Sequence, residues 1–366
     1  PLGVDGFRGA VQLMAGEYEV SEQLNINDDG VVLRGAGSQA VDGTRIIFTS
    51  TAPAGETATL IRIGGAGSPS LSSPTAITNG FVGVGATSFT VADVSPYGVG
   101  DMIRISRNTN DRWITDLGMD AYGWAADSYP LSYERFITGI SGNVIHIDAP
   151  IIQTIEDKYG GGQIARYSHP GQVRNIGIEA LRFESTYAGD TDEDHGWNAV
   201  MISDARDIWV RQVTAQHFAY SCVFVNADSH FVTVEDSAQL DPVSEITGGR
   251  RYSFVADDSS YLLFQRNYTR RGRHDFVTHS RTPGPHVFVD SRADQSYSDT
   301  GPHHRYAFGG LYDNIMNRAG SGSPSAGRIN VQNRRTSGTG HGWAGAQIMV
   351  WNSDALGATV DAPLGA

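Results

Sequence analysis

Cysteine, lysine and long apolar runs are scarce in this chain of 366 residues. The single cysteine, Cys222, cannot form an intrachain disulfide, and no stretch approaches the roughly 18 consecutive apolar residues of a membrane helix. The chain begins at Pro1 without a basic segment followed by an apolar one, so we expect that any export signal has been removed. These absences exclude a disulfide scaffold and a helical membrane protein. We expect a secreted or periplasmic protein with no membrane partner.

The charge is unevenly distributed between residue types. The chain carries 27 basic and 40 acidic side chains, a net charge of -13, and Lys158 is the only lysine. Proteins that bind nucleic acid over a broad surface need positive charge to displace counterions from phosphates. We therefore expect no nucleic-acid partner, and a polyanion can be bound only at a local arginine-rich patch.

Helix signals are rare, whereas short runs of Val, Ile and Phe alternate with polar turns. From about residue 173 these runs form two families. The first comprises runs that begin at Asn198, Ser221, Tyr252, Asp275, Tyr306 and Ile329. The second comprises runs that begin at Asp207, His230, Tyr261, His286, Leu311 and Gln347.

The first family recurs at spacings of 23, 31, 23, 31 and 23 residues. A unit of this length with short strands and no helix is typical of a parallel β-helix, whose coils stack at about 4.8 Å and share one interior. The additional residues of alternate coils must form loops on one side of the cylinder. The alternative, a β-sandwich, predicts hairpin turns and no fixed period.

The first 63 residues carry the same signature less regularly. The segments 9–20 and 30–38, which contain Gly-Ala-Val-Gln-Leu-Met and Val-Val-Leu-Arg-Gly-Ala-Gly-Ser, resemble the opening coils of the pectate-lyase-like superfamily of right-handed β-helices. The resemblance implies a single-stranded right-handed parallel β-helix. In many lyases of this kind the catalytic base is a lysine or arginine beside calcium. Lys158 lies outside the regular coils, so a lysine base is not expected here.

Three regions follow from the pattern. Residues 1–63 are predicted to form N-terminal coils, and residues 171–366 to form regular coils that carry a substrate groove. Between them, residues 64–170 lose the period and contain hairpin-like runs such as 81–91. We expect this region to be a small β insertion, with an irregular polar and aromatic part that walls one side of the groove.

Chemistry is expected where loops and unusual residues coincide. Nine arginines, six aspartates and five histidines lie between Arg250 and Arg305, which makes a locally basic strip. Arginine binds carboxylates through two parallel hydrogen bonds, and aromatic rings stack on sugar faces. The strip therefore predicts an acidic polysaccharide as partner. The alternative is a solvated ladder in which these side chains pair with Asp275, Asp294 and Asp299.

Cleavage of a uronate by β-elimination needs neutralisation of the carboxylate, a base for the α-proton and an acid for the leaving oxygen. Histidine titrates near neutral pH, so we predict His274 as the base, while tyrosine or arginine stay open for that role. Arg251 and Arg305, predicted one coil to either side, would hold the carboxylate. Tyr220 or His304 would supply the proton. The predicted substrate-binding residues are Trp197, Asn198, His217, Arg250, Arg271, Arg273, His303 and Trp343.

The predicted function is a monomeric polysaccharide lyase without an organic cofactor. The alternatives are a glycoside hydrolase or a uronate epimerase on the same fold, or a glycan-binding β-helix without activity. For hydrolysis, Asp257, Asp258 and His341 resemble parts of a polygalacturonase site, but the two aspartates align with a tight turn. The glycine-rich segment 338–345 either brings His341 and Trp343 over the groove or turns a coil.

One acidic segment raises the question of calcium. Asp190, Asp192 and Asp194 alternate as oxygen ligands do at the start of a calcium loop, but position twelve of such a loop is Met201 rather than glutamate. The segment is either a weak calcium site or a solvated acidic turn.

Overall fold

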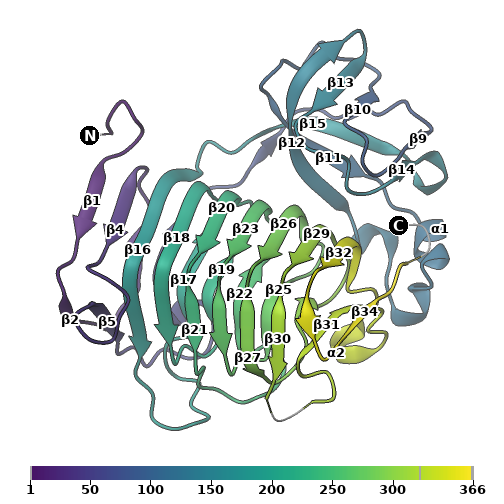
Figure 1. Cartoon of the computed structure of the whole chain (residues 1–366). Coiled ribbons are helices and arrows are strands. Elements are labelled where there is room, and N and C mark those ends of the chain that lie inside the picture. Colours follow the sequence, from purple (N-terminus) through teal and green to yellow (C-terminus); the bar gives the residue numbers. More distant parts are fainter. Residues whose placement is uncertain (1, 321–322, 364–366) are drawn as a thin grey trace.

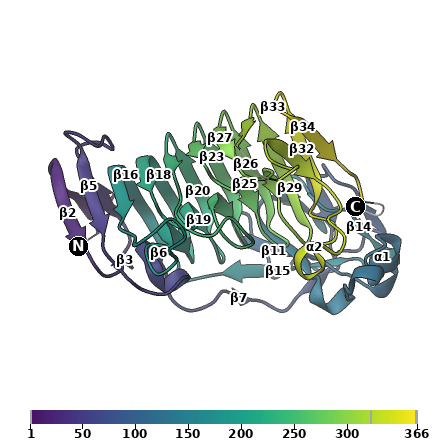
Figure 2. The same ribbon diagram turned by 90° about the horizontal axis from the view of Figure 1, so that it is seen from below.

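The structure is a computed structural model that describes residues 2–320 and 323–363. Parallel strands coil into an elongated three-faced cylinder, and an antiparallel unit stands beside its C-terminal half (Figures 1 and 2). The chain is a right-handed parallel β-helix, which confirms the predicted fold class. Within the described chain, no helix has the length and apolar character that crossing a membrane requires.

One face of the cylinder is a seven-stranded parallel sheet, here called the cleft sheet because the site described below lies on its outer face. Its strands pair in the order in which they follow along the chain. They are β3 (Leu24–Ile26), β6 (Thr59–Gly64), β17 (Asn198–Ser203), β19 (Ser221–Val225), β22 (Tyr252–Ala256), β25 (His274–Thr278) and β28 (Gly301–Pro302).

The other two faces belong to one 16-stranded sheet that bends around a corner. The long strand β18 (Ala205–Gln216) spans the corner, because its first part pairs with β20 and its last part with β21. One face continues through β20 (His230–Glu235), β23 (Ser260–Gln265), β26 (Pro283–Val289), β29 (Ala307–Asp313) and β32 (Gly345–Trp351). The other continues through β21 (Ala238–Leu240), β24 (Tyr268–Arg270), β27 (Arg292–Ser296), β30 (Met316–Ala319) and β33 (Asp354–Ala355).

The first coils complete this sheet at the N-terminal end. The strand β16 (Val173–Ser185) pairs with β18 on one side and with β4 and β5 on the other. The N-terminal strands are β1 (Gly9–Gln12), β2 (Gly16–Val20), β4 (Val31–Arg34) and β5 (Thr44–Phe48), and the 3-10 turn η1 (Glu56–Ala58) precedes β6. At the C-terminal end, β31 (Arg328–Val331) pairs in parallel with β34 (Gly357–Val360).

The interior is filled by side chains that repeat from coil to coil. Phe254 stacks on Phe276 with ring centroids 5.9 Å apart, and Phe264 stacks on Phe288 at 4.7 Å. Burying one such ring contributes roughly 1.5–3 kcal/mol, so the repeated apolar column supplies much of the stability. The alternation of apolar and polar residues in the sequence exists because only every second side chain of a strand enters this column.

The strand register corrects part of the predicted repeat. The second family is found where predicted, since Ile208, Val232, Leu262 and His286 follow one another across paired strands. The first family is wrong at Tyr306, which directly precedes β29 of the large sheet, since the next strand of the cleft sheet is β28. Its last member, Ile329 of β31, does follow on this face and forms a parallel bridge with Thr300. The extended, fully buried run 306–308 has the composition of a cleft-sheet strand but packs against the insertion instead.

Residues 70–168 contain antiparallel pairs, unlike the parallel coils. Their strands are β7 (Ser70–Leu71), β8 (Thr75–Ala76), β9 (Phe81–Val82), β10 (Ser88–Thr90), β11 (Met102–Arg107), β12 (Leu131–Ser141), β13 (Val144–Ile147), β14 (Ile155–Glu156) and β15 (Gly162–Ser168). Short helical elements join them: α1 (Asp111–Asp116), η2 (Asp120–Tyr122), η3 (Ala126–Ser128) and η4 (Asp157–Tyr159). We call this unit the insertion. It has its own core, which also includes Tyr306, Phe308 and Ala346 of the cylinder.

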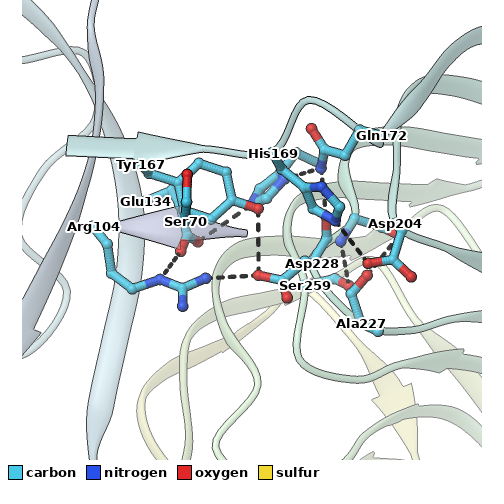
Figure 3. Close-up of polar contacts among 12 residues, drawn as sticks. Ser70, Arg104, Glu134, Tyr167, His169, Gln172, Asp204, Ala227, Asp228 and Ser259 are labelled. Atoms are coloured by element: carbon cyan, nitrogen blue, oxygen red, sulfur yellow. Dashed lines mark hydrogen bonds and ion pairs between the residues drawn. The ribbon is translucent and has the colours of Figure 1, made fainter. Parts of the chain in front are cut away.

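A polar network fixes the insertion to the cylinder (Figure 3). Arg104 of β11 forms ion pairs with Glu134 at 2.5 Å and with Asp228 of the cylinder at 2.6 Å. Glu134 also lies 3.2 Å from Nε2 of His230. The partners hold the pKa of the buried Glu134 carboxyl down at about 2 in spite of the opposing effect of burial. The buried charges are therefore compensated, and this contact places the insertion in one orientation.

Candidate active site

A cleft of about 740 Å³ lies on the outer face of the cleft sheet, near β22 and β25. We call it the histidine cleft. Loop residues 248–249 form one wall, and residues 323, 325 and 332–341 form another. Its lining is unusually rich in ring nitrogens, hydroxyls and guanidinium groups, which come from Tyr220, Tyr252, Arg273, His274, His279, His303, His304, Arg334 and His341.

Five histidine rings follow one another along the cleft. His303 is central: its ring centroid lies 4.5 Å from that of His274 and 5.0 Å from that of His341. His304 lies 5.1 Å from His341 and 5.5 Å from His279. Consecutive coils bring these rings together, since His274 and His279 flank β25 and His303 and His304 follow β28.

The cleft favours the neutral form of His274, His304 and His341. Burial lowers the pKa of His274, and burial with the nearby Arg334 and Arg305 lowers the pKa of His341 to about 4. The pKa of His304 falls to about 3, because burial is reinforced by neighbouring His279 and His341. A neutral imidazole has a free lone pair, so these rings can accept hydrogen bonds near neutral pH.

His274 has one ring nitrogen engaged and one free. Its Nδ1 lies 2.6 Å from the carbonyl oxygen of Asp299 and 3.2 Å from the Asp299 carboxylate. Because both of these are acceptors, Nδ1 carries the proton and Nε2 carries the lone pair. Nε2 is buried and has no hydrogen-bond partner in the described part of the protein. This is the protonation state that a general base requires.

A second arrangement joins a phenol, an imidazole and a carboxylate. The Tyr220 hydroxyl lies 3.0 Å from His279 Nε2, and His279 Nδ1 lies 3.2 Å from the Asp257 carboxylate. The carboxylate accepts from Nδ1, so Nε2 accepts the hydroxyl proton of Tyr220. Burial raises the pKa of Tyr220 well above its usual value. The phenol therefore keeps a proton that it can donate.

Two arginines give the cleft positive charge. Arg334 forms an ion pair with the buried Asp299, which also contacts His274. Arg273 lies on the opposite wall, and its Nη1 is buried without a hydrogen-bond partner among the described residues. An anionic ligand group could provide that partner.

The structure separates several predicted site residues from the histidine cleft. Arg251, His217 and Arg271 line a second cleft of about 570 Å³, together with Tyr187 and residues 241–246. Arg251 is 5% exposed and donates to the carbonyl oxygen of Ser244 at 2.7 Å. Arg250 pairs with Glu193 at 2.7 Å.

The predicted column of residues before the strands is wrong at His274. Tyr252 pairs with His274 in the register, so Arg251 lies beside Arg273 rather than one coil below His274. Arg305 precedes β29 on another face and donates to the backbone oxygen of Thr339 at 2.9 Å. The register agrees with the sequence spacing up to β22, where Val223 pairs with Phe254, and shifts by one residue between β22 and β25.

The remaining predicted residues occupy different surroundings. Trp197 stacks on Tyr220 with centroids 5.9 Å apart, next to the cleft. Asn198 is buried and bonds to Thr59 and Ser221, so it belongs to an internal ladder. The Trp343 indole donates to the carbonyl oxygen of Leu117 in the insertion, at 2.9 Å.

The acidic turn folds on itself. The Asp192 carboxylate accepts from the backbone N–H groups of Ala188 at 2.8 Å and Asp194 at 3.0 Å. These bonds lower the pKa of Asp192. Across the described chain, no group of three or more His, Cys, Asp or Glu residues is arranged to hold a metal ion. The calcium site at Asp190, Asp192 and Asp194 stays a prediction.

Sequence reasoning did not single out Tyr252, His279 and Arg334, which complete the cleft. It named Asp299 only as an ion-pair partner of the arginines and histidines, and the structure places that carboxylate 3.2 Å from His274 Nδ1. Tyr252 binds His303 Nε2 through its hydroxyl at 3.0 Å. One signal was present, because His279 directly follows the short strand that begins at His274. Asp299 and Arg334 meet only through the loops after β27 and β31, which strand spacing does not describe.

Comparison with known proteins yields structural likeness only. No family model and no curated protein matches the chain. Among solved structures, it is similar to the tailspike gp61 of Pseudomonas phage phi297, with 13% identity, a TM-score of 0.42 and coverage of 94% of this chain and 60% of that one.

Two further solved structures with a similar fold are enzymes. DFA-IIIase from Arthrobacter chlorophenolicus A6 without its lid is 11% identical, with a TM-score of 0.41 and coverage of 97% of this chain and 81% of that one. Endo-xylogalacturonan hydrolase from Aspergillus tubingensis is 10% identical, with a TM-score of 0.34 and coverage of 99% and 91%. The chain thus spans about three fifths of the phi297 tailspike's length, and its function has to be argued from its own residues.

Proposed function

We propose that this protein binds an acidic polysaccharide in the histidine cleft and cleaves it next to a uronate by β-elimination. One observation carries the proposal: six nitrogens on residues that line a single cleft are buried and have no hydrogen-bond partner in the described chain. Leaving each one unsatisfied costs about 1–3 kcal/mol. A ligand rich in hydroxyls and carboxylates would satisfy them. The atoms are Arg273 Nη1, His274 Nε2, His303 Nδ1, His304 Nδ1, Arg334 Nε and His341 Nδ1.

The substrate carboxylate is assigned to Arg273. Arg334 already pairs with Asp299, whereas Nη1 of Arg273 has donors to spare. A guanidinium on the carboxylate stabilises the enolate-like charge that develops when the adjacent C–H bond breaks. This role was predicted for Arg251 and Arg305, but Arg251 lines the second cleft and Arg305 is bonded to Thr339 of the cleft wall.

His274 and Tyr220 are the proposed base and acid. The α-proton passes to His274 Nε2, and the electrons of the C–H bond form the carbon–carbon double bond. The bond to the leaving oxygen breaks, and that oxygen takes the proton of Tyr220. The ring of Tyr252 lies between the two groups, 5.2 Å from Tyr220 and 5.0 Å from His274. Base and acid therefore approach the substrate from separate positions.

The experiment uses the ultraviolet absorbance of unsaturated uronates while the protein is incubated with pectate, alginate, glucuronan, ulvan or glycosaminoglycans. A rise with one polymer and a loss of about 10²–10⁴-fold in His274→Gln are expected. His146→Gln in β13 of the insertion is the matched control. New reducing ends without a rise in absorbance would replace elimination with hydrolysis.

A further inference from the structure

One wall of the histidine cleft is a single glycine-rich loop, residues 334–343, here called the cleft loop. It brings two groups to the cleft, Arg334 at its start and His341 near its end. Gly338, Gly340 and Gly342 adopt φ values of 58°, 77° and 57°, a backbone region that side chains rarely occupy. The loop therefore follows a path that depends on outside support.

The base of the cleft loop is tied to the cylinder. The backbone N–H of Arg334 donates to the oxygen of Gly342 at 2.7 Å, and the N–H of Arg305 donates to the oxygen of His341 at 3.0 Å. These bonds close the loop. They leave the position of its glycine-rich tip, α2 (Ser337–Gly340), to other contacts.

The insertion adds two reciprocal indole bonds to the bond that Arg305 of the cylinder donates to the oxygen of Thr339 in the tip. Trp124 of the insertion donates from Nε1 to the carbonyl oxygen of Gly340 at 3.2 Å. Trp343 of the cleft loop donates from Nε1 to the carbonyl oxygen of Leu117 at 2.9 Å. Figure 2 shows α2 and α1 at the same end of the molecule.

The packing around these bonds is tight. A Cβ atom on Gly342 would lie 2.5 Å from the Trp124 ring and 2.7 Å from Met119 Sδ. Trp124 is itself held by stacking on Tyr129, with centroids 4.0 Å apart. The loop can thus approach the insertion this closely only because it has glycine at this position.

We infer that the insertion is a positioning element of the histidine cleft, in which Trp124 and Trp343 fix the cleft loop and thereby place His341 and Arg334. Neither indole lines the histidine cleft, and each donates its own hydrogen bond. Both therefore act on the cleft residues through the cleft loop. This inference rests on the proposed function only for its effect on turnover.

The test measures the position of His341 directly, by NMR titration of protein labelled with ¹³C-histidine. The His341 signal is assigned from its absence in His341→Gln. The low pKa of His341, about 4, reflects burial, Arg334, Arg305 and His274. In Trp124→Phe the indole N–H bond is lost, and so is the contact of the outer indole ring with Gly342. The loop should then open, and the pKa of His341 should rise by about one unit or more toward its ordinary value of about 6.5.

His286, buried in the cylinder, reports whether the fold is intact. The inference predicts that its titration is unchanged in Trp124→Phe, and that Trp343→Phe gives the same shift of His341. If the titration of His286 also changes in Trp124→Phe, the fold of that variant is altered, and the pKa of His341 in Trp343→Phe then decides the test. An unchanged His341 pKa in a variant with an unchanged His286 titration would overturn the inference.

A second measurement links the position of the loop to turnover. On the polymer that the wild type cleaves, kcat/KM of Trp124→Phe should fall by at least about tenfold, because small displacements of binding groups reduce rates strongly. The surface substitution Phe81→Ser in the insertion is the control and should have no effect. If the wild type cleaves no polymer, the proposed function fails, and the NMR titration still decides the positioning of His341.

Discussion

The buried imidazole of His286 predicts how the stability of this protein depends on pH. His286 lies in β26 and is 0% exposed, and its Nδ1 lies 3.4 Å from the carbonyl oxygen of Pro283. Nε2 has no partner within the described residues. Burial lowers the pKa of His286 to about 4, whereas a histidine in the unfolded chain titrates near 6.5.

Between these two pKa values the unfolded chain binds a proton that the folded protein excludes. Its contribution to stability is therefore complete above about pH 6.5 and decreases as the pH falls toward about 4. From about pH 7.5 to about pH 5 the decrease is roughly 2 kcal/mol for this one residue. The neutral histidines of the cleft add to the effect in the same direction.

The assay compares urea unfolding of the wild type and His286→Asn at about pH 7.5 and about pH 5. The free energy of unfolding of the wild type should decrease between these two pH values. Because the variant lacks the titrating group, its decrease should be smaller than that of the wild type by roughly 2 kcal/mol. His146→Asn in the insertion should behave as the wild type does. Equal pH dependence in His286→Asn and the wild type would refute the reasoning.

Three further changes test the site, the core and the junction. Arg273→Gln should lower kcat/KM for the cleaved polymer by about 10²–10³-fold through loss of carboxylate stabilisation, whereas an unaffected rate would exclude Arg273. Phe276→Ala should destabilise the cylinder by about 3–5 kcal/mol in urea unfolding, because neighbouring coils cannot close the space. Glu134→Gln should cost about 3 kcal/mol by leaving buried Arg104 and His230 without part of their compensation, and hydrogen exchange should increase first in the insertion.

The fold could be predicted because the apolar residues of its core repeat along the sequence. Each coil contributes apolar side chains to one interior column, so Val234, Phe264 and Phe288 follow one another across paired strands. The predicted register was wrong at Tyr306, because the buried side chain of this residue belongs to the core of the insertion rather than to that of the cylinder. The strand that replaces it, Gly301–Pro302, has no apolar pattern to reveal it.

The site was only partly predictable, for a geometric reason. Local composition pointed to His274, His303 and His304, which line one cleft. It could not show that the side chain of Arg251 lines a second cleft, whereas Arg273 lines the same cleft as His274. His341 is distant along the chain from His303, yet the fold places their rings 5.0 Å apart. Loops that bridge coils follow their own contacts, and these contacts have no period.

The central claim is that the histidine cleft eliminates across a uronate linkage. The most direct test follows ultraviolet absorbance on the polymer panel with wild type, His274→Gln and Tyr220→Phe, with a reducing-end assay on the same samples. The account predicts that wild type produces unsaturated ends and that both variants lose them while their unfolding transitions stay cooperative. Reducing ends without absorbance, or full activity in His274→Gln, would contradict it.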